Sequence, residues 1–126
     1  MSEQLRFAMQ LPAHARSVAV ARSLVRHLHG LLTDDQIGRA EIIMSELVTN
    51  AIRHGSDGAG YVQVEVTADS GALRASISDH GPPFSVPPGP PRLDQTGGFG
   101  LYIVGRLTTV YRIERSATGN VVTFSV

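Results

Sequence analysis

A carboxylate and a carboxamide stand four residues apart in the segment from Glu46 to Gly55. In a helix, at about 100° per residue, Glu46 and Asn50 lie one turn apart on the same side, and Arg53 falls near them. A carboxylate so placed can orient or deprotonate a hydroxyl or a water. An Asn oxygen is a suitable ligand for Mg²⁺. An ordinary solvated helix face gives the same pattern, and a short motif does not separate the two readings.

A second carboxylate, Asp79, ends a segment in which polar and apolar residues alternate. The alternation puts it on the face of Leu73, Ala75 and Ile77, the face expected to be buried. A buried carboxylate needs a hydrogen-bond donor, and the exocyclic amine of a base would serve. Gly81 would let a ligand approach the backbone closely. Alternatively, Asp79 turns into solvent or caps its own loop.

Three glycines, Gly97, Gly98 and Gly100, precede an apolar segment of helical spacing that begins at Leu101. Glycines at the start of a helix let bare N–H groups face an anion, and the helix dipole adds to the attraction, so a phosphate chain would fit. No Gly-Lys-Ser or Gly-Lys-Thr follows, and no parallel βαβ unit surrounds the cluster, so neither a P-loop nor a dinucleotide fingerprint is indicated. A flexible loop end remains an alternative.

Neither histidine nor cysteine suggests a metal site. His27 and His29 are two residues apart on a predicted helix and point to different sides. His54 lies near the face of Glu46 and Asn50, where a ligand contact and capping of the helix end are both open. The chain contains no cysteine, which excludes disulfides and thiolate-metal sites.

A frame of helices and strands must hold these residues. Polar/apolar alternation and helical spacing predict strands at about 4–11, 61–67, 73–79, 109–115 and 120–126, and helices at about 13–29, 33–54 and 98–107. A capping box, Thr33 to Gln36, should open the second helix. Turns at Gly71 and Gly119 indicate hairpins, so the sheet should be mixed and mostly antiparallel. We expect an α+β, two-layer sandwich with the helices on one face.

Prolines gather in one segment: six of the seven fall between Pro82 and Pro91. Such a segment cannot be regular helix or central strand. We expect residues 82–96 to form a surface loop or lid.

Length, charge and the lack of long apolar runs indicate what class of protein this is. A chain of 126 residues predicts one compact domain, residues 1–126. Eleven basic and eleven acidic residues give a formal net charge of zero, unlike a nucleic-acid binder. No signal peptide or membrane-length apolar run is present, so we expect a cytoplasmic protein.

Taken in order, Glu46-x-x-x-Asn50, Asp79-x-Gly81 and Gly98-x-Gly100 resemble the N, G1 and G2 boxes of the GHKL (Bergerat-fold) ATPase superfamily. Within it, the segment from Glu46 to Gly55 is similar to that of the small bacterial anti-sigma-factor serine kinases. The resemblance spans nearly the whole chain. The second glycine that the G1 box often carries is replaced by Pro83.

The resemblance implies roles for these positions. Glu46 would be the general base, and Asn50 would bind Mg²⁺. Asp79 would accept the adenine amino group of ATP, with Gly81 beside the base. Residues further along would complete the nucleotide site: Gly98 and Gly100 at the phosphates, with Phe99, Leu101 and His54 as further contacts, and Thr123 at the adenine end. Residues 82–96 would be the ATP lid.

The resemblance also implies a function and partners. It predicts an ATP- and Mg²⁺-dependent protein serine/threonine kinase that phosphorylates an anti-sigma antagonist of the STAS type and sequesters a sigma factor, without direct contact to nucleic acid. A homodimer is a further expectation. The absence of a preceding histidine-bearing helix pair argues against a sensor histidine kinase. A binding module without kinase activity and a slow ATPase remain alternatives.

Overall fold

The computed structural model describes residues 4–54, 60–82, 104–108, 110–116 and 119–126. Within them the chain forms five strands and two long helices: β1 (Gln4–Pro12), α1 (Arg16–Arg26), α2 (Asp34–His54), β2 (Tyr61–Asp69), β3 (Ala72–Asp79), β4 (Val110–Ser116) and β5 (Gly119–Ser125). Residues 104–107 are also helical.

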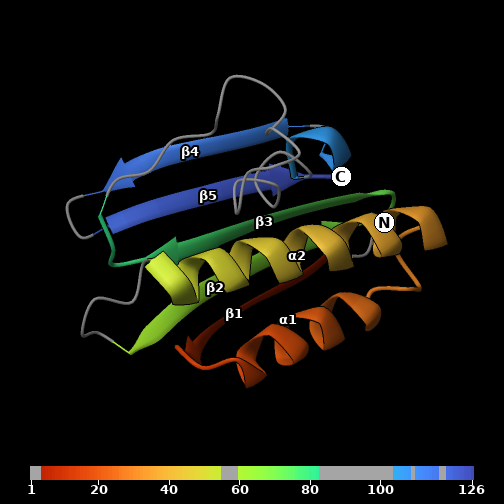
Figure 1. Ribbon diagram of the computed structural model, residues 1–126. Coiled ribbons are helices and arrows are strands. Elements are labelled where there is room, and N and C mark those ends of the chain that lie inside the picture. Colours follow the sequence, from red (N-terminus) through yellow and green to blue (C-terminus); the bar gives the residue numbers. More distant parts are fainter. Residues whose placement is uncertain (1–3, 55–59, 83–103, 109, 117–118) are drawn as a thin grey trace, which may run out of the picture.

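The strands form one sheet in the order β1-β2-β3-β5-β4, and every neighbouring pair is antiparallel. Figure 1 shows α1 and α2 side by side on one face of this sheet. The other face of the sheet carries no helix among the described residues. The predicted α+β class, the two layers and the antiparallel pairing are therefore confirmed.

The core lies between the sheet and the helices. Alternate residues of β2 and β3 point into it, among them Val62, Val64 and Ile77, each at most 2% exposed. From α2, Met44 and Val48 meet them and are fully buried. Burying a side chain of this size contributes about 1.5–3 kcal/mol, so this apolar stripe fixes which side of α2 faces the sheet.

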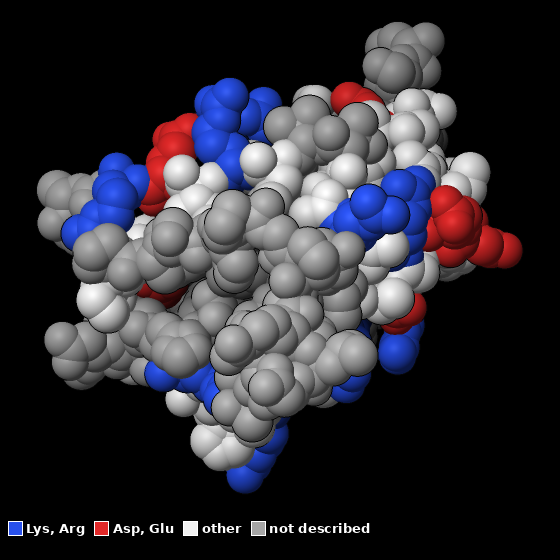
Figure 2. Space-filling model, turned by 45° about the horizontal axis from the view of Figure 1, so that its top comes forward, with Lys and Arg blue, Asp and Glu red and all other residues white. Residues whose placement is uncertain are grey.

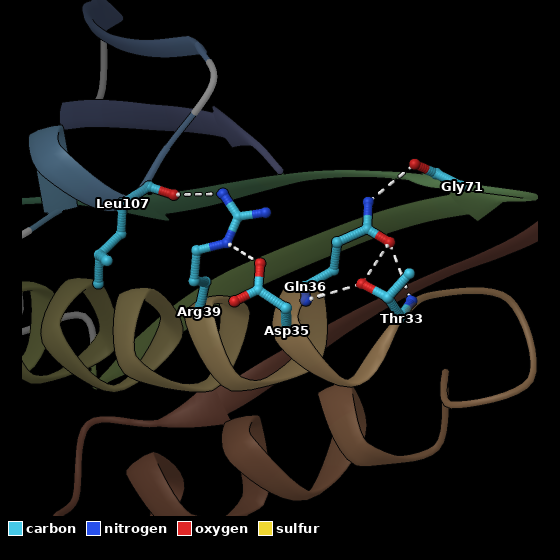
Figure 3. A network of polar contacts seen from close by, with 6 residues as sticks. All are labelled: Thr33, Asp35, Gln36, Arg39, Gly71 and Leu107. Carbon is cyan, nitrogen blue, oxygen red and sulfur yellow. Dashed lines mark hydrogen bonds and ion pairs between the residues drawn. The ribbon is translucent and has the colours of Figure 1, made fainter.

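The predicted capping box opens α2. The Gln36 backbone N–H donates to Thr33 Oγ1 at 3.1 Å, and the Thr33 N–H donates to Gln36 Oε1 at 2.9 Å. Gln36 does more than cap, because its Nε2 donates to the carbonyl oxygen of Gly71 at 2.8 Å (Figure 3). The start of α2 is thereby bonded to the turn between β2 and β3.

One turn further along α2, Arg39 bonds a second neighbour. Its Nε lies 3.0 Å from Asp35 Oδ2, and its Nη1 donates to the carbonyl oxygen of Leu107 at 3.3 Å (Figure 3). Leu107 is the last residue of the 104–107 helix, where carbonyl groups lack helical partners. The contact places the Arg39 side of α2 beside that helix.

Two predicted boundaries differ from the structure. The first helix is α1, Arg16–Arg26, shorter than the predicted 13–29. Before its start, the Ala13 N–H donates to Gly60 O, outside the helix. After its end, the Leu28 N–H donates to Val25 O three residues back, which is the hydrogen bond of a 3₁₀ turn and not of an α-helix. The helix expected from about residue 98 is described only at 104–107, and the lid beyond Pro82 lies outside the described residues.

Tyr111 of β4 carries a buried hydroxyl with no hydrogen-bond partner among the described residues. Burial raises the pKa of this phenol from 10.0 to about 12. The raised folded pKa means that the fold favours the neutral form. This contribution to stability is complete below pH 10 and is lost as the pH rises from 10 to about 12.

We expect Tyr111→Phe to stabilise the protein by about 1 kcal/mol at neutral pH, because it removes an unsatisfied buried group. The variant should also lose less stability than the parent between pH 9 and 11. Urea unfolding at both pH values measures this, and the chain's lack of lysine keeps the alkaline titration simple. A variant less stable than the parent at pH 7 would show that the hydroxyl has a partner.

Candidate nucleotide site

Three elements bring candidate residues to one end of the sheet. α2 and β3 begin close together, where Gln36 bonds Gly71, and Figure 1 shows that they run in the same direction. Their carboxyl ends therefore lie at the same end of the molecule, where β5 also begins (Figure 1). Asn50 is one turn from the end of α2, and Asp79 is the last residue of β3.

Asp79 is buried, with 5% of its surface exposed, as the alternation predicted. Its Oδ1 accepts the backbone N–H of Gly81 at 2.9 Å and Nδ2 of Asn120 at 3.0 Å. The first bond is the loop-capping contact left open as an alternative. Among the described residues, both hydrogen bonds go to Oδ1, so a further donor would be directed to Oδ2.

Asn120, the residue paired with Asp79 across β3 and β5, is a site residue that the sequence reasoning missed. It is 1% exposed, and its Nδ2 also lies 2.8 Å from Pro82 O and 3.4 Å from Gly81 O. Its Oδ1 is buried and has no hydrogen-bond partner within the described ranges. The sequence could have indicated it, because Asn120 lies two positions before Val122 and so on the core side of the predicted strand. A polar side chain on that side needs a hydrogen-bond partner.

The glycine beside Asn120 permits a close approach of two strands. A Cβ on Gly119 would overlap the carbonyl oxygen of Asp79 and would lie 2.7 Å from both Asp79 C and His80 Cα. Only a residue without a side chain can occupy this position. Gly119 thus sets how closely β5 approaches the backbone that carries the Asp79 carboxylate.

Glu46 and Asn50 lie on the side of α2 that Arg39 fixes. They follow Arg39 by seven and eleven residues, a spacing that keeps all three on one side of a helix. The Arg39–Leu107 bond holds this side of α2 against the 104–107 helix near the start of α2, and Glu46 and Asn50 continue the same side toward the end of α2. Both Glu46 and Asn50 are half-buried.

Glu46 also borders a hollow of ≈ 470 Å³ on the outer surface of the two long helices. Arg22 and Arg26 of α1 form one wall, and Arg26 pairs with Glu41 across it. The exposed Ile42 also lines this hollow. Glu46 is therefore a half-buried residue that borders a hollow open to the surface.

Other predicted site residues are not brought together. Thr123 lies three residues from Asn120 in β5 and so on the opposite face of the sheet, where its Oγ1 is 3.2 Å from Ser76 Oγ. The structure does not place it beside Asp79. The remaining predicted contacts fall outside the described part of the chain: the side chain of His54 and the residues Gly98, Phe99, Gly100 and Leu101.

Charged side chains of both signs lie on the face of the molecule that Figure 2 draws. Figure 2 shows Asp and Glu beside the basic residues, with neither sign forming a large patch. Across the described ranges, no three His, Cys, Asp or Glu residues converge as a metal site. None of the helices in these ranges is long and apolar enough to cross a membrane.

The described residues fit a nucleotide with Mg²⁺. The buried Asp79 carboxylate and Asn120, whose Oδ1 finds no partner in the part of the chain that the structure describes, form a polar group at the edge of an apolar core, as a base with donor groups requires. Asn50 offers a hard oxygen, and Mg²⁺ bound through substrate phosphates needs only one or two protein ligands.

Solved structures share this fold. The RsbU and RsbW domains of Rv1364c from Mycobacterium tuberculosis match with a TM-score of 0.72 at 22% identity, over 96% of this chain and 32% of that one. The histidine kinase domain of a blue-light activated histidine kinase from Erythrobacter litoralis EL346 matches with a TM-score of 0.50 at 20% identity. The match covers 92% of this chain and 61% of that one. A structure of that kinase matches with a TM-score of 0.52 at 24% identity, over 92% of this chain and 42% of that one.

These likenesses show a common fold, and this chain spans less than two thirds of each of those chains. No curated protein sequence matches this chain. The family model of the histidine kinase-like ATPase domain matches residues 11–126, which include every element that places Glu46, Asn50 and Asp79. The chain therefore belongs to the histidine kinase-like ATPase domain family.

Proposed function

We propose that this protein is an ATP- and Mg²⁺-dependent serine/threonine kinase that phosphorylates an anti-sigma antagonist and also sequesters a sigma factor in the cytoplasm. The observation that carries the proposal is the alignment of Glu46 and Asn50 on one side of α2, at the end where Asp79 closes the core face. The family and the fold shared with the RsbW domain of Rv1364c support it.

Each residue has a defined task in this proposal. Asp79 accepts the exocyclic amine of adenine, and Asn120 holds the carboxylate in place through a 3.0 Å bond. Asn50 supplies an oxygen to Mg²⁺. Bound ATP with Mg²⁺ provides the phosphoryl group and neutralises its charge, so the protein contributes mainly positioning.

Glu46 would act on the hydroxyl of the protein substrate. A general base must lie within hydrogen-bond reach of the proton that it takes. The hollow between α1 and α2 gives a serine or threonine side chain a route to Glu46 from the surface. Arg22 and Arg26 in its wall would attract acidic groups that flank the hydroxyl.

Nucleotide binding is the first test. We expect Asp79→Asn to weaken ATP binding by about 10- to 100-fold, because a hydrogen bond to a charged acceptor is worth roughly 1.5–3 kcal/mol. Isothermal titration calorimetry with ATP and Mg²⁺ measures this, with unfolding curves to confirm that the variant folds. Inosine triphosphate, which has a keto group in place of the amine, should bind the parent more weakly. Equal affinity of Asp79→Asn and the parent for ATP would refute the assignment of Asp79.

A module that binds ATP and a partner without phosphate transfer is the second candidate. The Asp79–Asn120 group favours it, because this group can hold a base without any residue that reacts. Glu46 distinguishes the two candidate functions, because a kinase needs a general base and a binding module does not. A slow ATPase without a protein substrate would release phosphate from ATP when no antagonist is present.

A further inference from the structure

The end of the sheet opposite Asp79 carries a hollow of ≈ 630 Å³. Three arginines from three elements line it: Arg6 of β1, Arg39 of α2 and Arg74 of β3. Thr67 and Gln36 add polar groups. Figure 1 places this end, where β1, β3 and α2 begin, away from the ends of α2 and β3 that carry Asn50 and Asp79.

A second hollow of ≈ 650 Å³ adjoins the first on the face of the sheet opposite the helices. The two share Arg6, Thr67 and Arg74. Strand register explains why: Arg6 pairs with Thr67, Thr67 with Arg74, and Arg74 with Ser125, so these residues form one row across four strands. The two hollows thus adjoin along a row that holds two arginines, and together they are called the depression below.

The arginines at its centre are available to a ligand. Arg6 and Arg74 are exposed, and neither forms an ion pair with another described residue. By contrast, Arg39 is bonded to Asp35, and Arg112 on the same sheet face pairs with Glu114 at 3.3 Å. Guanidinium groups bind carboxylates bidentately, and the hydroxyl of Thr67 between them adds a donor.

We propose that this depression binds an acidic segment of a partner protein. Its length across two hollows exceeds what a single small anion would fill. Glu65 and Asp69 in its walls repel any negative charge placed beside them. A peptide with spaced carboxylates can direct them to Arg6 and Arg74 and keep them from Glu65 and Asp69, whereas a nucleic-acid strand carries a charge at every phosphate. The proposal does not rest on nucleotide chemistry and adds a second interaction surface to the protein.

Fluorescence anisotropy with a short labelled peptide, in which Glu alternates with Ser, tests the proposal. The double variant Arg6→Ser/Arg74→Ser should bind this peptide about tenfold more weakly, since each exposed ion pair is worth up to ~1 kcal/mol. Arg112→Ser, which removes an arginine of the same face outside the depression, should bind like the parent. Binding by the parent should also weaken as salt is raised from low to physiological concentration.

Several results would overturn the proposal. They are the absence of peptide binding, an equal loss in Arg112→Ser, and equal binding of a peptide with Gln in place of Glu. Displacement of the peptide by inorganic phosphate at low millimolar concentration would instead assign a small-anion site. Tighter binding of an oligothymidylate would assign a nucleic-acid surface. ATP affinity, measured on the double variant, should equal that of the parent and shows that the fold is intact.

Discussion

Glu46→Gln should lower the rate of phosphate transfer to an antagonist protein by about 10²- to 10⁴-fold, the range that general base catalysis contributes. The amide keeps the size of the carboxylate but cannot take a proton. Glu46 is half-buried on α2 and makes none of the contacts that hold the helix to Gly71 and Leu107. The fold and the affinity for ATP should therefore remain close to those of the parent.

A transfer assay with radiolabelled ATP and candidate antagonists measures this rate, and calorimetry measures ATP binding in parallel. Glu41→Gln is the matched control, because Glu41 also borders the outer hollow and lies one turn and a fraction before Glu46. It should leave transfer within a few-fold of the parent. Undiminished transfer by Glu46→Gln would remove Glu46 from the mechanism. Binding of ATP without transfer by the parent would favour the binding module.

Gly119→Ala should be strongly destabilising, by about 1–3 kcal/mol or more, the range for overpacking a tight contact. The added Cβ would overlap the Asp79 carbonyl oxygen and lie 2.7 Å from His80 Cα, and backbone cannot rotate away as a side chain can. Relief requires β5 to move from β3 at the point where Asn120 meets Asp79. Affinity for ATP should therefore fall together with stability.

Gly38→Ala is the opposite case in the same chain. Gly38 lies inside α2, and no atom lies within 4 Å of a Cβ built there. Alanine should stabilise the protein by about 0.5–1 kcal/mol, since glycine is unfavourable inside a helix. Urea unfolding compares the two variants under identical conditions. Equal stability of Gly119→Ala and the parent would mean that β3 and β5 are not held so closely.

Local sequence patterns were sufficient for much of the fold. Alternation in 61–67 and 73–79 predicted β2 and β3, and a two-residue turn that ends at Gly71 joins them as expected. The Thr33–Gln36 pattern predicted the start of α2. These features depend on residues within a few positions of one another, so that backbone sterics and neighbouring side chains determine them.

The composition of the site was harder to predict, because strand register is not local. Asp79 was expected to be buried, but its partner Asn120 is 41 positions away and meets it only through the pairing of β3 with β5. Thr123 of the same strand was expected at the adenine end. Three positions along a strand reverse the face, so Thr123 points away from Asp79.

Hydrogen-bond acceptors outnumber hydrogen-bond donors around Asp79. Five oxygens that accept hydrogen bonds gather there: both Asp79 carboxylate oxygens, the carbonyl oxygens of Gly81 and Pro82, and Asn120 Oδ1. The N–H of Gly81 and the two amide hydrogens of Asn120 are the only donors that they share among the described residues. A ligand that presents an N–H to these oxygens reduces the shortage of donors. A ligand that presents another oxygen increases it. Because acceptors outnumber donors, we expect the site to bind an amino group more tightly than a keto group.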